Sequence, residues 1–245
     1  MNKKELEARE AELISSFFGQ RETGFFVEVG ANGPRFLSQT WHLEEKGWRG
    51  ILIEPNPACA LQLRQERRNA TVFQVACSAP EKTGEALFHF SSSSGLSGLE
   101  KHVDDPDIRY DRSEKVKVMT LDAILDSAEH PPVDFVSIDV EGTELDVLKG
   151  FDLARHRPPL LLVEDKVNNL RKHTHLTRHG YKLVRRTSLN NWYIPRNQSY
   201  HATPWPERIE LIRKMYLATP LRRLKLEWKR LRTSRAARAA SAHTG

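Results

Sequence analysis

The stretch that decides the fold is FFVEVGANG, residues 25–33. Its first half, Phe25–Val29, is an apolar run typical of a strand buried on both faces of a parallel sheet. A glycine turn follows, and residues 35–46 then have the spacing of a helix. A Gly-rich turn between a buried strand and a helix lets the backbone approach a ligand closely, because a Cβ atom would collide there. The segment therefore predicts the first unit of an α/β sheet with a ligand site at the end of its strand.

Further apolar runs alternate with helix-like stretches along the rest of the chain. We expect strands at Ile51–Ile53, Val72–Ala76, Phe135–Val140, Leu160–Val163, Tyr181–Val184 and Trp192–Ile194. We expect helices at 3–18, 57–68 and 143–149, and two more beyond Pro204 that Pro220 separates. This alternation predicts a doubly wound, mostly parallel sheet, and the short connection at 186–190 predicts that the last two strands are antiparallel.

Residues 79–119 interrupt the alternation. We expect a short strand at Ala86–Phe90, then the loop Ser91–Gly98 and a polar segment that runs to Arg112. Gly and Ser make mobile loops, so Ser91–Gly98 is either a lid over a substrate or a plain surface loop. Thr120 is expected to cap a short helix.

Composition sets the broad class. The chain has 245 residues, 39% of them hydrophobic, and a net charge of +6. Its two cysteines lack metal-like spacing, and the charged N-terminus lacks the apolar region of a secretory signal, so we expect a cytoplasmic protein. Residues 208–245 hold eleven Lys and Arg against two Glu, a net charge of +9 that leaves −3 for the rest. The mildly acidic main body argues against a nucleic-acid partner.

We expect three segments. Residues 1–20 form a helix that packs on the domain, residues 21–198 form the main domain, and residues 199–245 form a basic helical appendage. In the last segment, Leu221, Leu224, Trp228 and Leu231 share one helical face among basic side chains. Such a helix is expected either to dock on the domain or to lie on an anionic membrane surface as a peripheral contact.

The residues of the glycine turn favour one ligand class over another. Dinucleotide sites place a pyrophosphate on a G-x-G-x-x-G turn, which is absent here. S-adenosylmethionine (AdoMet) has no phosphate, and its ammonium group needs a carboxylate. Glu28 would place a carboxylate at the strand end, two residues before Gly30. The turn therefore favours AdoMet.

The next two strands end in groups that suit a nucleoside. In ILIEPNP, residues 51–57, Glu54 lies 24 residues after Gly30, where an acidic side chain can accept both hydrogen bonds of a ribose diol. At the end of the third strand, Gln74-Val75-Ala76 offers small and apolar groups that could face an adenine ring. A buried strand end explains this third segment nearly as well.

Two acidic pairs follow the fourth and fifth strands. Asp139 and Glu141, in FVSIDVEGTE, are expected on one side of an extended segment. Glu164 and Asp165 end the next strand. Carboxylates at these ends sit where open α/β sheets bind ligands. They could orient a methyl donor, hold a substrate hydroxyl or bind Mg²⁺ through oxygen, although Glu141 could instead cap the following helix.

Together these motifs resemble the FkbM family of AdoMet-dependent methyltransferases. The resemblance runs from about Gly24 to Pro195, and rests on FFVEVGAN, GWRGILIEPNP, TLDAIL and FVSIDVEGTELDVLKGF. It implies a Rossmann-like class I methyltransferase fold: a seven-stranded, mostly parallel sheet with helices on both faces. It also implies AdoMet as cofactor and, in many members, O-methylation of a small molecule or a glycan. Family members commonly follow the Asn with Asp-Gly, whereas this chain has Gly33-Pro34, and Pro34 suits the first turn of a helix.

The resemblance assigns residues to each part of the cofactor. The methionine part would border Glu28, Gly30, Ala31, Asn32 and Gly33. Glu54, with Pro55 and Asn56 after it, would hold the ribose, and Gln74, Val75 and Ala76 would border the adenine. The region Asp139–Gly142 would lie between cofactor and acceptor.

A hydroxyl acceptor needs a base to take its proton as it attacks. Asp139 and Glu141 are the first candidates for this catalytic role, followed by Glu164, His173 and His175. Two other functions stay open at this point: a nicotinamide-dependent oxidoreductase on a similar fold, and a non-catalytic Rossmann-like module that binds a partner.

Overall fold

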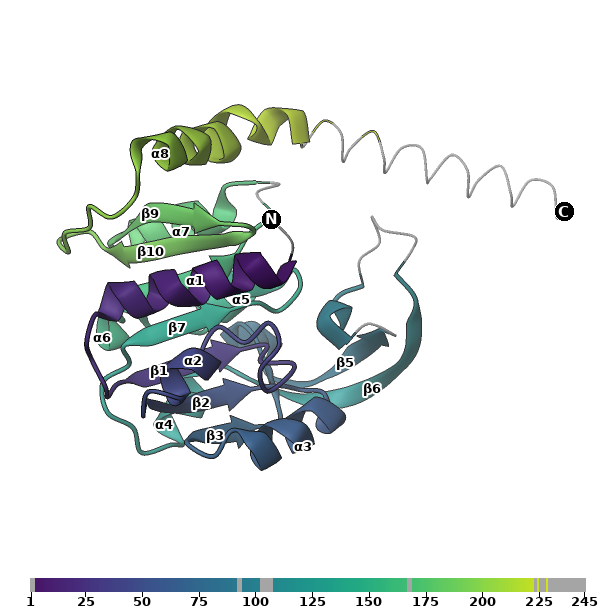
Figure 1. Ribbon diagram of the computed structural model, residues 1–245. Coiled ribbons are helices and arrows are strands. Elements are labelled where there is room, and N and C mark those ends of the chain that lie inside the picture. Colours follow the sequence, from purple (N-terminus) through teal and green to yellow (C-terminus); the bar gives the residue numbers. More distant parts are fainter. Residues whose placement is uncertain are drawn as a thin grey trace, which may run out of the picture.

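The computed structural model describes residues 3–91, 94–101, 108–166, 169–222, 224 and 228. Its main sheet has seven strands in the order β3-β2-β1-β7-β8-β10-β9 (Figure 1). The strands are β1 Phe25–Val29, β2 Arg49–Ile53, β3 Ala70–Phe73, β7 Phe135–Ile138, β8 Leu160–Glu164, β9 Tyr181–Thr187 and β10 Asn190–Pro195. All pairs are parallel except those of β10, which is antiparallel to β8 and β9. The expected Rossmann-like class I fold and its antiparallel last pair are confirmed.

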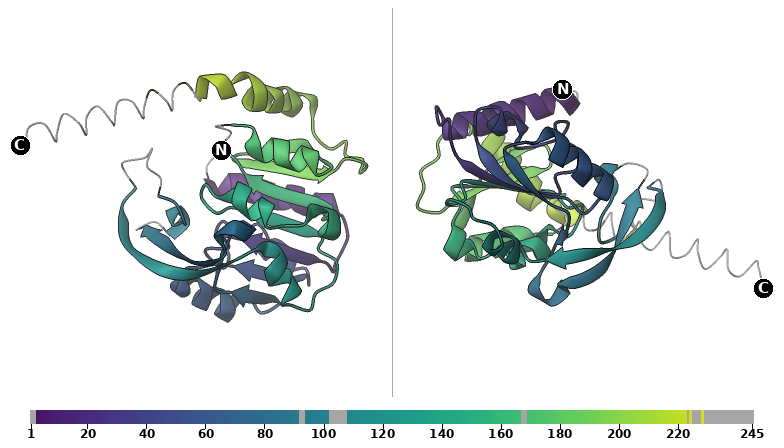
Figure 2. Two further views of the ribbon diagram at one scale, coloured as in Figure 1. Left: turned by 180° about the vertical axis from the view of Figure 1, so that it is seen from behind. Right: turned by 90° about the horizontal axis from the view of Figure 1, so that it is seen from below.

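Helices cover both faces of this sheet (Figures 1 and 2). They are α1 Lys3–Phe18, α2 Trp41–Glu44, α3 Pro57–Glu66, α4 Leu121–Asp126, α5 Glu144–Lys149, α6 Leu153–His156, α7 Arg171–Arg178 and α8 Trp205–Ile212. On one face, α1, α2 and α3 bury their apolar side chains against Phe26 and Leu52. On the other, α4, α5 and α7 pack against Val27 and Ile51. Neighbouring residues of a strand therefore serve opposite core layers, which explains why these strands are apolar at nearly every position.

A second, three-stranded sheet lies beside the first. It has the order β4-β6-β5, with β4 Ala76–Cys77, β5 Gly84–Ser91 and β6 Tyr110–Met119. The expected single strand Val72–Ala76 is therefore wrong, because the chain leaves the main sheet after Phe73 and pairs with β6 instead. Sequence patterns missed β6, since most of its residues are exposed and half of them are charged. Short 3₁₀ turns occur at Pro80–Lys82 and Ser94–Leu96.

The helix expected at residues 35–46 is also wrong. Only Trp41–Glu44 is helical, and Leu37 has a left-handed φ of 67°. The Glu28 carboxylate accepts hydrogen bonds from the hydroxyl groups of Ser38 and Thr40 and from the backbone N–H of Gln39. A buried acceptor that takes hydrogen bonds from three consecutive residues holds them in a loop, in competition with helical hydrogen bonds. Pro34 therefore precedes a loop and not a helix.

After β10 the chain returns along β9 as α8 (Figure 1). A π-helical turn, η3 Arg213–Leu217, continues α8, and a bend at Ala218 precedes the helical residues 219–222. The break expected at Pro220 therefore lies earlier, at Ala218, and Pro220 itself belongs to the helical residues that follow. Residues 223, 225–227 and 229–245 lie outside the described part, including most of the expected basic tail and Leu231. In the described ranges, no helix has the length and apolar character needed to cross a membrane.

The carboxyl ends of β1 and β7 come unusually close at Gly30. A Cβ atom on Gly30 would lie 1.8 Å from the Asp139 carbonyl oxygen, and Gly30 has a φ of +83°. The Asp139 N–H donates to the Val29 carbonyl, while the N–H groups of Gly30 and Ala31 both donate to Ile53. Only glycine fits this position, on grounds of both space and backbone conformation. Gly33 differs, because a Cβ there would meet nothing nearer than 3.7 Å.

We predict that Gly30→Ala prevents the two strand ends from meeting, whereas Gly33→Ala is tolerated. The first substitution should lower the free energy of unfolding by about 3 kcal/mol or more, and the second should change it by less than about 1 kcal/mol. Chemical denaturation of both variants measures these values. Equal stability of the two variants would contradict the close approach seen at Gly30.

Candidate active site

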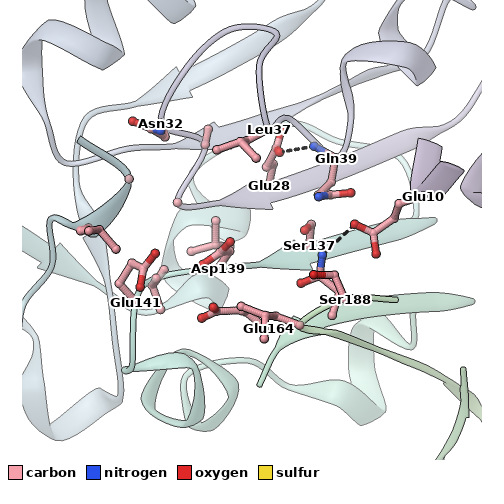
Figure 3. A pocket seen from close by; sticks show the side chains of 18 of the residues that line it. Glu10, Glu28, Asn32, Leu37, Gln39, Ser137, Asp139, Glu141, Glu164 and Ser188 are labelled. Atoms are coloured by element: carbon pink, nitrogen blue, oxygen red, sulfur yellow. Dashed lines mark hydrogen bonds between the residues drawn. The ribbon is translucent and has the colours of Figure 1, made fainter. Parts of the chain in front are cut away.

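A cavity of about 660 Å³ opens at the carboxyl ends of β1, β2, β7 and β8. Figure 3 shows side chains from several of these strand ends turned into it. This is the edge at which open α/β sheets bind ligands, and the volume is in the range of small-molecule sites. The elements that line it form two groups, which we call the first and the second half of the cavity. One borders the glycine turn and β2, and the other borders α1 and the turn between β9 and β10.

Glu54 is the polar centre of the first half. It is 6% exposed and its two oxygens accept the N–H groups of Asn32, at 2.8 Å, and Asn56, at 2.7 Å. Burial raises the pKa of Glu54 to about 7, although these two hydrogen bonds lower it in part. Each oxygen has a second lone pair, so an ionised Glu54 keeps acceptor capacity for a pair of hydroxyl groups.

Glu28 also lines the cavity, but protein groups already occupy most of its carboxylate. One oxygen accepts the hydroxyl groups of Ser38, at 2.9 Å, and Thr40, at 2.5 Å, and lies 3.8 Å from Arg67. The other accepts the Gln39 N–H at 2.7 Å, a bond drawn in Figure 3. Glu28 therefore shapes the loop that borders the cavity. Its expected contact with the ammonium end of AdoMet stays a prediction, for which one oxygen retains a free lone pair.

The remaining residues expected at the cofactor fall into two groups. Those that line the cavity are Gly30, Ala31, Asn32, Pro55, Val75 and Ala76. Three lie outside its lining: Gly33, Asn56 and Gln74. Asn56 instead caps α3 through its side chain, and the exposed Gln74 accepts a hydrogen bond from Arg64. Cys77, which the sequence did not single out, lines the cavity beside Ala76.

Three carboxylates meet where the two halves join. An oxygen from each of Asp139, Glu141 and Glu164 lies within 4.8 Å of the others, and all three face the cavity (Figure 3). The expectation that Asp139 and Glu141 share a side because the segment is extended is wrong, since β7 ends at Ile138. A left-handed turn at Glu141, with a φ of 55°, brings the two carboxylates together instead.

Little positive charge balances these carboxylates. Lys166 Nζ lies 3.1 Å from Glu141 and 4.0 Å from Glu164, at the outer side of the cluster. Burial raises the pKa of Glu164 to about 7, and the negative charge of Glu144 adds to this effect. Asp139 is open to the cavity but otherwise surrounded by protein. Desolvation is the main reason why the pKa of Asp139 lies well above its usual value, and the negative charges of Glu164 and Glu141 raise this pKa further. Three oxygen ligands in this arrangement could hold a proton or a divalent cation.

Three other candidates from the sequence do not line the cavity. Asp165 turns away from Glu164 because consecutive strand-end residues face opposite sides, and it forms an ion pair with Lys172 at 3.2 Å. His173 bonds the hydroxyl groups of Tyr193 and Tyr216. His175 contacts the Leu148 carbonyl. A direct role for these side chains in proton transfer is therefore not supported.

Sequence reasoning missed the second half of the cavity. Its lining includes Glu7 and Glu10 from α1, Ser188 and Asn190 from the β9–β10 turn, and Ser137 from β7. The Glu10 carboxylate accepts hydrogen bonds from Thr187 and Asn190, and its burial raises its pKa. No sequence signal marked these residues, because they come from a helix and a hairpin that flank the parallel strands.

The loop Ser91–Gly98 borders the same cavity through Gly95, Leu96 and Ser97. Ser92 and Ser93 of this loop lie outside the described residues. The loop is thus correctly positioned for the expected lid, and its movement stays a prediction.

The residues present fit AdoMet. Glu54 offers acceptors for a diol, the apolar Val75 and Ala76 lie nearby for a base, and the acidic cluster suits a positively charged sulfonium. A pyrophosphate would meet the same carboxylates without a G-x-G-x-x-G turn to bind it. The charge of the cavity therefore favours AdoMet over a dinucleotide.

The acidic cluster predicts a characteristic dependence of stability on pH. Glu164 has a higher pKa folded than its ordinary value of 4.5, so the folded state binds more protons between pH 4.5 and about 7 and loses stability as the pH rises through this window. We expect Glu164→Gln to raise the free energy of unfolding at pH 8. The change in unfolding free energy that the substitution causes should be more favourable at pH 8 than at pH 5, by about 2 kcal/mol.

Denaturation of both proteins at the two pH values measures this difference. Asp165→Asn is the matched control, because it breaks the ion pair with Lys172 and should destabilise the protein at pH 8. A gain for Glu164→Gln that does not depend on pH would contradict the charge repulsion inferred here.

A family model agrees with this geometry. A family model described as the methyltransferase FkbM domain matches residues 28–183, which is more than half of the chain. Among solved structures, precorrin-6y C5,15-methyltransferase from Geobacter metallireducens GS-15 is 16% identical, with 79% of this chain and 88% of that chain covered and a TM-score of 0.43. A SAM-dependent methyltransferase from Aquifex aeolicus is 11% identical over 79% of this chain and 92% of that one, with a TM-score of 0.41.

TrmK of M. capricolum, solved with S-adenosyl-homocysteine, is 10% identical over 94% of this chain and 96% of that one, with a TM-score of 0.40. No curated protein sequence matches the chain. The family match sets aside the nicotinamide-dependent oxidoreductase that the glycine turn alone leaves open. The chain belongs to the FkbM family of AdoMet-dependent methyltransferases.

Proposed function

We propose that the protein methylates a hydroxyl oxygen of a small molecule or a glycan. The observation that carries this proposal is the cluster of Asp139, Glu141 and Glu164 at the junction of the two cavity halves. A hydroxyl group becomes a good nucleophile only as it loses its proton, so the reaction needs a base beside the acceptor. Burial raises the pKa of Asp139 and brings the pKa of Glu164 to about 7, and carboxylates with raised pKa values suit this role.

The first half of the cavity is assigned to the cofactor. We assign the ribose hydroxyl groups to Glu54, the adenine to the side of Val75 and Ala76, and the methionine end to Gly30 and Asn32. Bound AdoMet supplies an electrophilic methyl group on a positively charged sulfur. The strand ends then hold donor and acceptor at the short separation that in-line displacement requires.

Asp139 is the first choice for the base, because it is open to the cavity and lies between the two halves. Its raised pKa indicates that a proton received from the acceptor is held well. Glu164 lies next to it with a pKa of about 7 and can share that proton. The acceptor oxygen forms its bond to the methyl carbon as the carbon–sulfur bond breaks, and its proton passes to this carboxylate pair.

The second half of the cavity is assigned to the acceptor. Its lining groups include the carboxylates of Glu7 and Glu10, the Ser188 hydroxyl and the Asn190 amide. Such groups accept hydrogen bonds from several hydroxyls at once, as a saccharide or another polyhydroxylated molecule requires. Their negative charges disfavour a nucleic acid, whose phosphates would be repelled.

The same convergence of oxygens favours a second role for the cluster, in which it holds Mg²⁺ and the cation positions the acceptor. Transfer that survives thorough chelation would dismiss this role and leave the carboxylates as the base.

We predict that AdoMet binds more tightly as the pH rises through 7. The free Glu54 has a pKa of about 7, and the ionised carboxylate accepts both ribose hydroxyl groups, so affinity should increase about tenfold between pH 6 and pH 8. Glu54→Gln should bind more weakly and lose most of this increase. Calorimetric titration measures both effects.

Gln74→Ala is the matched control, because Gln74 lies outside the cavity and its loss should leave the affinity unchanged. Wild-type binding in Glu54→Gln at every pH would remove Glu54 from the cofactor site.

We predict that Asp139→Asn lowers methyl transfer by roughly 10²- to 10⁴-fold, because the amide cannot take a proton. Cofactor binding should change far less, since Asn retains the size of the side chain. Transfer of labelled methyl groups to a panel of saccharides and small hydroxylated molecules measures the rate. His173→Ala is the control and should keep full activity.

Unchanged transfer by Asp139→Asn would exclude this residue as the base. A wild-type protein that binds AdoMet but methylates no member of a broad panel of hydroxyl acceptors would favour a binding module.

A further inference from the structure

The helix α8 has two faces with different environments. Its inner face contacts the domain through Glu207, which forms ion pairs with Arg9, at 2.8 Å, and Arg185, at 3.0 Å. Met215 in the following turn is fully buried. Glu207, with Glu210 and Lys214, also lines the cavity. The inner face is therefore held in place by ion pairs and by packing.

The outer face is apolar and exposed. We define the outer α8 face by Trp205, Ile209, Ile212, Leu217 and Leu221, which are 71%, 53%, 52%, 68% and 64% exposed. None of these residues lines the cavity. In Figure 1, α8 lies at the margin of the molecule, beside β9. The exposed fractions indicate that this face is turned to solvent.

The helix geometry aligns four of these residues, Trp205, Ile209, Ile212 and Leu217, in one stripe, and Leu221 follows beyond the bend at Ala218. Trp205, Ile209 and Ile212 follow the spacing of an α-helical face. The Ala218 N–H then donates to the Arg213 carbonyl five residues earlier, which closes a π-helical turn. Because a π turn contains one more residue than an α turn, Leu217 takes the place on the stripe that residue 216 would otherwise have.

An exposed stripe of this length marks an interaction surface, because soluble monomers rarely leave large contiguous apolar areas in water. Charge indicates the kind of partner. Arg208 and Arg213 are exposed beside the stripe, and residues 208–245 carry a net charge of +9. The stripe also begins with Trp205, a side chain favoured at the boundary between lipid and water.

We propose that the outer α8 face binds the surface of an anionic lipid bilayer. An apolar face flanked by basic side chains is the pattern of a helix that lies in the plane of a membrane interface. The apolar residues enter the boundary between headgroups and acyl chains, and the arginines contact the lipid phosphates. Because the inner face of the same helix borders the cavity, the bound protein holds its acceptor half close to the bilayer.

Sedimentation of the full-length protein with vesicles tests this proposal. Vesicles that contain about 30 mol % phosphatidylserine should bind at least tenfold more tightly than vesicles of phosphatidylcholine alone. Raising the salt concentration to about 0.5 M should remove most of that difference, because salt screens surface charges. The double variant Ile209→Asp, Ile212→Asp should lose at least tenfold of the affinity for the anionic vesicles.

Leu61→Asp is the matched control, because Leu61 is 55% exposed on α3 and lies outside the stripe. It should bind like the wild type, and circular dichroism of all variants checks that they fold. Sedimentation velocity without lipid tests whether the outer α8 face instead binds a second copy of the chain. Self-association that the double variant abolishes, equal binding to both kinds of vesicle, or no binding to either would overturn the proposal.

Discussion

The site depends on one close contact between two backbones. At Gly30 the end of β1 passes so near the Asp139 carbonyl oxygen that no residue with a Cβ atom would fit. Hydrogen bonds across this junction connect β1 to both β2 and β7. The strand ends that carry Glu54 and Asp139 therefore reach one cavity in a fixed arrangement. The residues assigned to the cofactor follow these strand ends directly, so the junction of the backbones also fixes where they begin.

The second constraint is electrostatic. Asp139, Glu141 and Glu164 lie closer together than isolated carboxylates would in water, and burial weakens their solvation. This arrangement is unfavourable in free energy. The two core layers beneath the site, where strands pack against helices on both faces, offset that free energy. Raised pKa values of Asp139 and Glu164 are the consequence, and Glu164, with a pKa of about 7, can take up a proton near neutral pH. The same carboxylates can attract a cation. Groups with perturbed pKa values in a cavity are typical of functional sites.

Much of this arrangement follows from sequence patterns. Buried parallel strands are apolar at nearly every position, so β1, β7 and β8 were predictable, as were Asp139 just after β7 and Glu164 at the end of β8. Glu54 was identified for the same reason. The convergence of Asp139 with Glu141 was also anticipated, although for the wrong reason, because a left-handed turn and not an extended strand joins them.

Other features depend on contacts between distant segments, which a local pattern does not contain. The loop at residues 35–40 takes its shape from the buried Glu28 carboxylate, so its helical spacing was misleading. The charged strand β6 forms because β5 and β4 pair with it from both sides. The second half of the cavity combines α1 with the β9–β10 hairpin, and Glu10 meets Asn190 across most of the chain's length.

The central claim is that AdoMet lies between Glu54 and the acidic cluster. A crystal structure with S-adenosylhomocysteine tests it most directly. The account predicts that both ribose hydroxyl groups donate to Glu54 and that the sulfur faces Asp139, with the adenine beside Val75. A ribose away from Glu54, or a sulfur that points away from the carboxylates, would contradict the account.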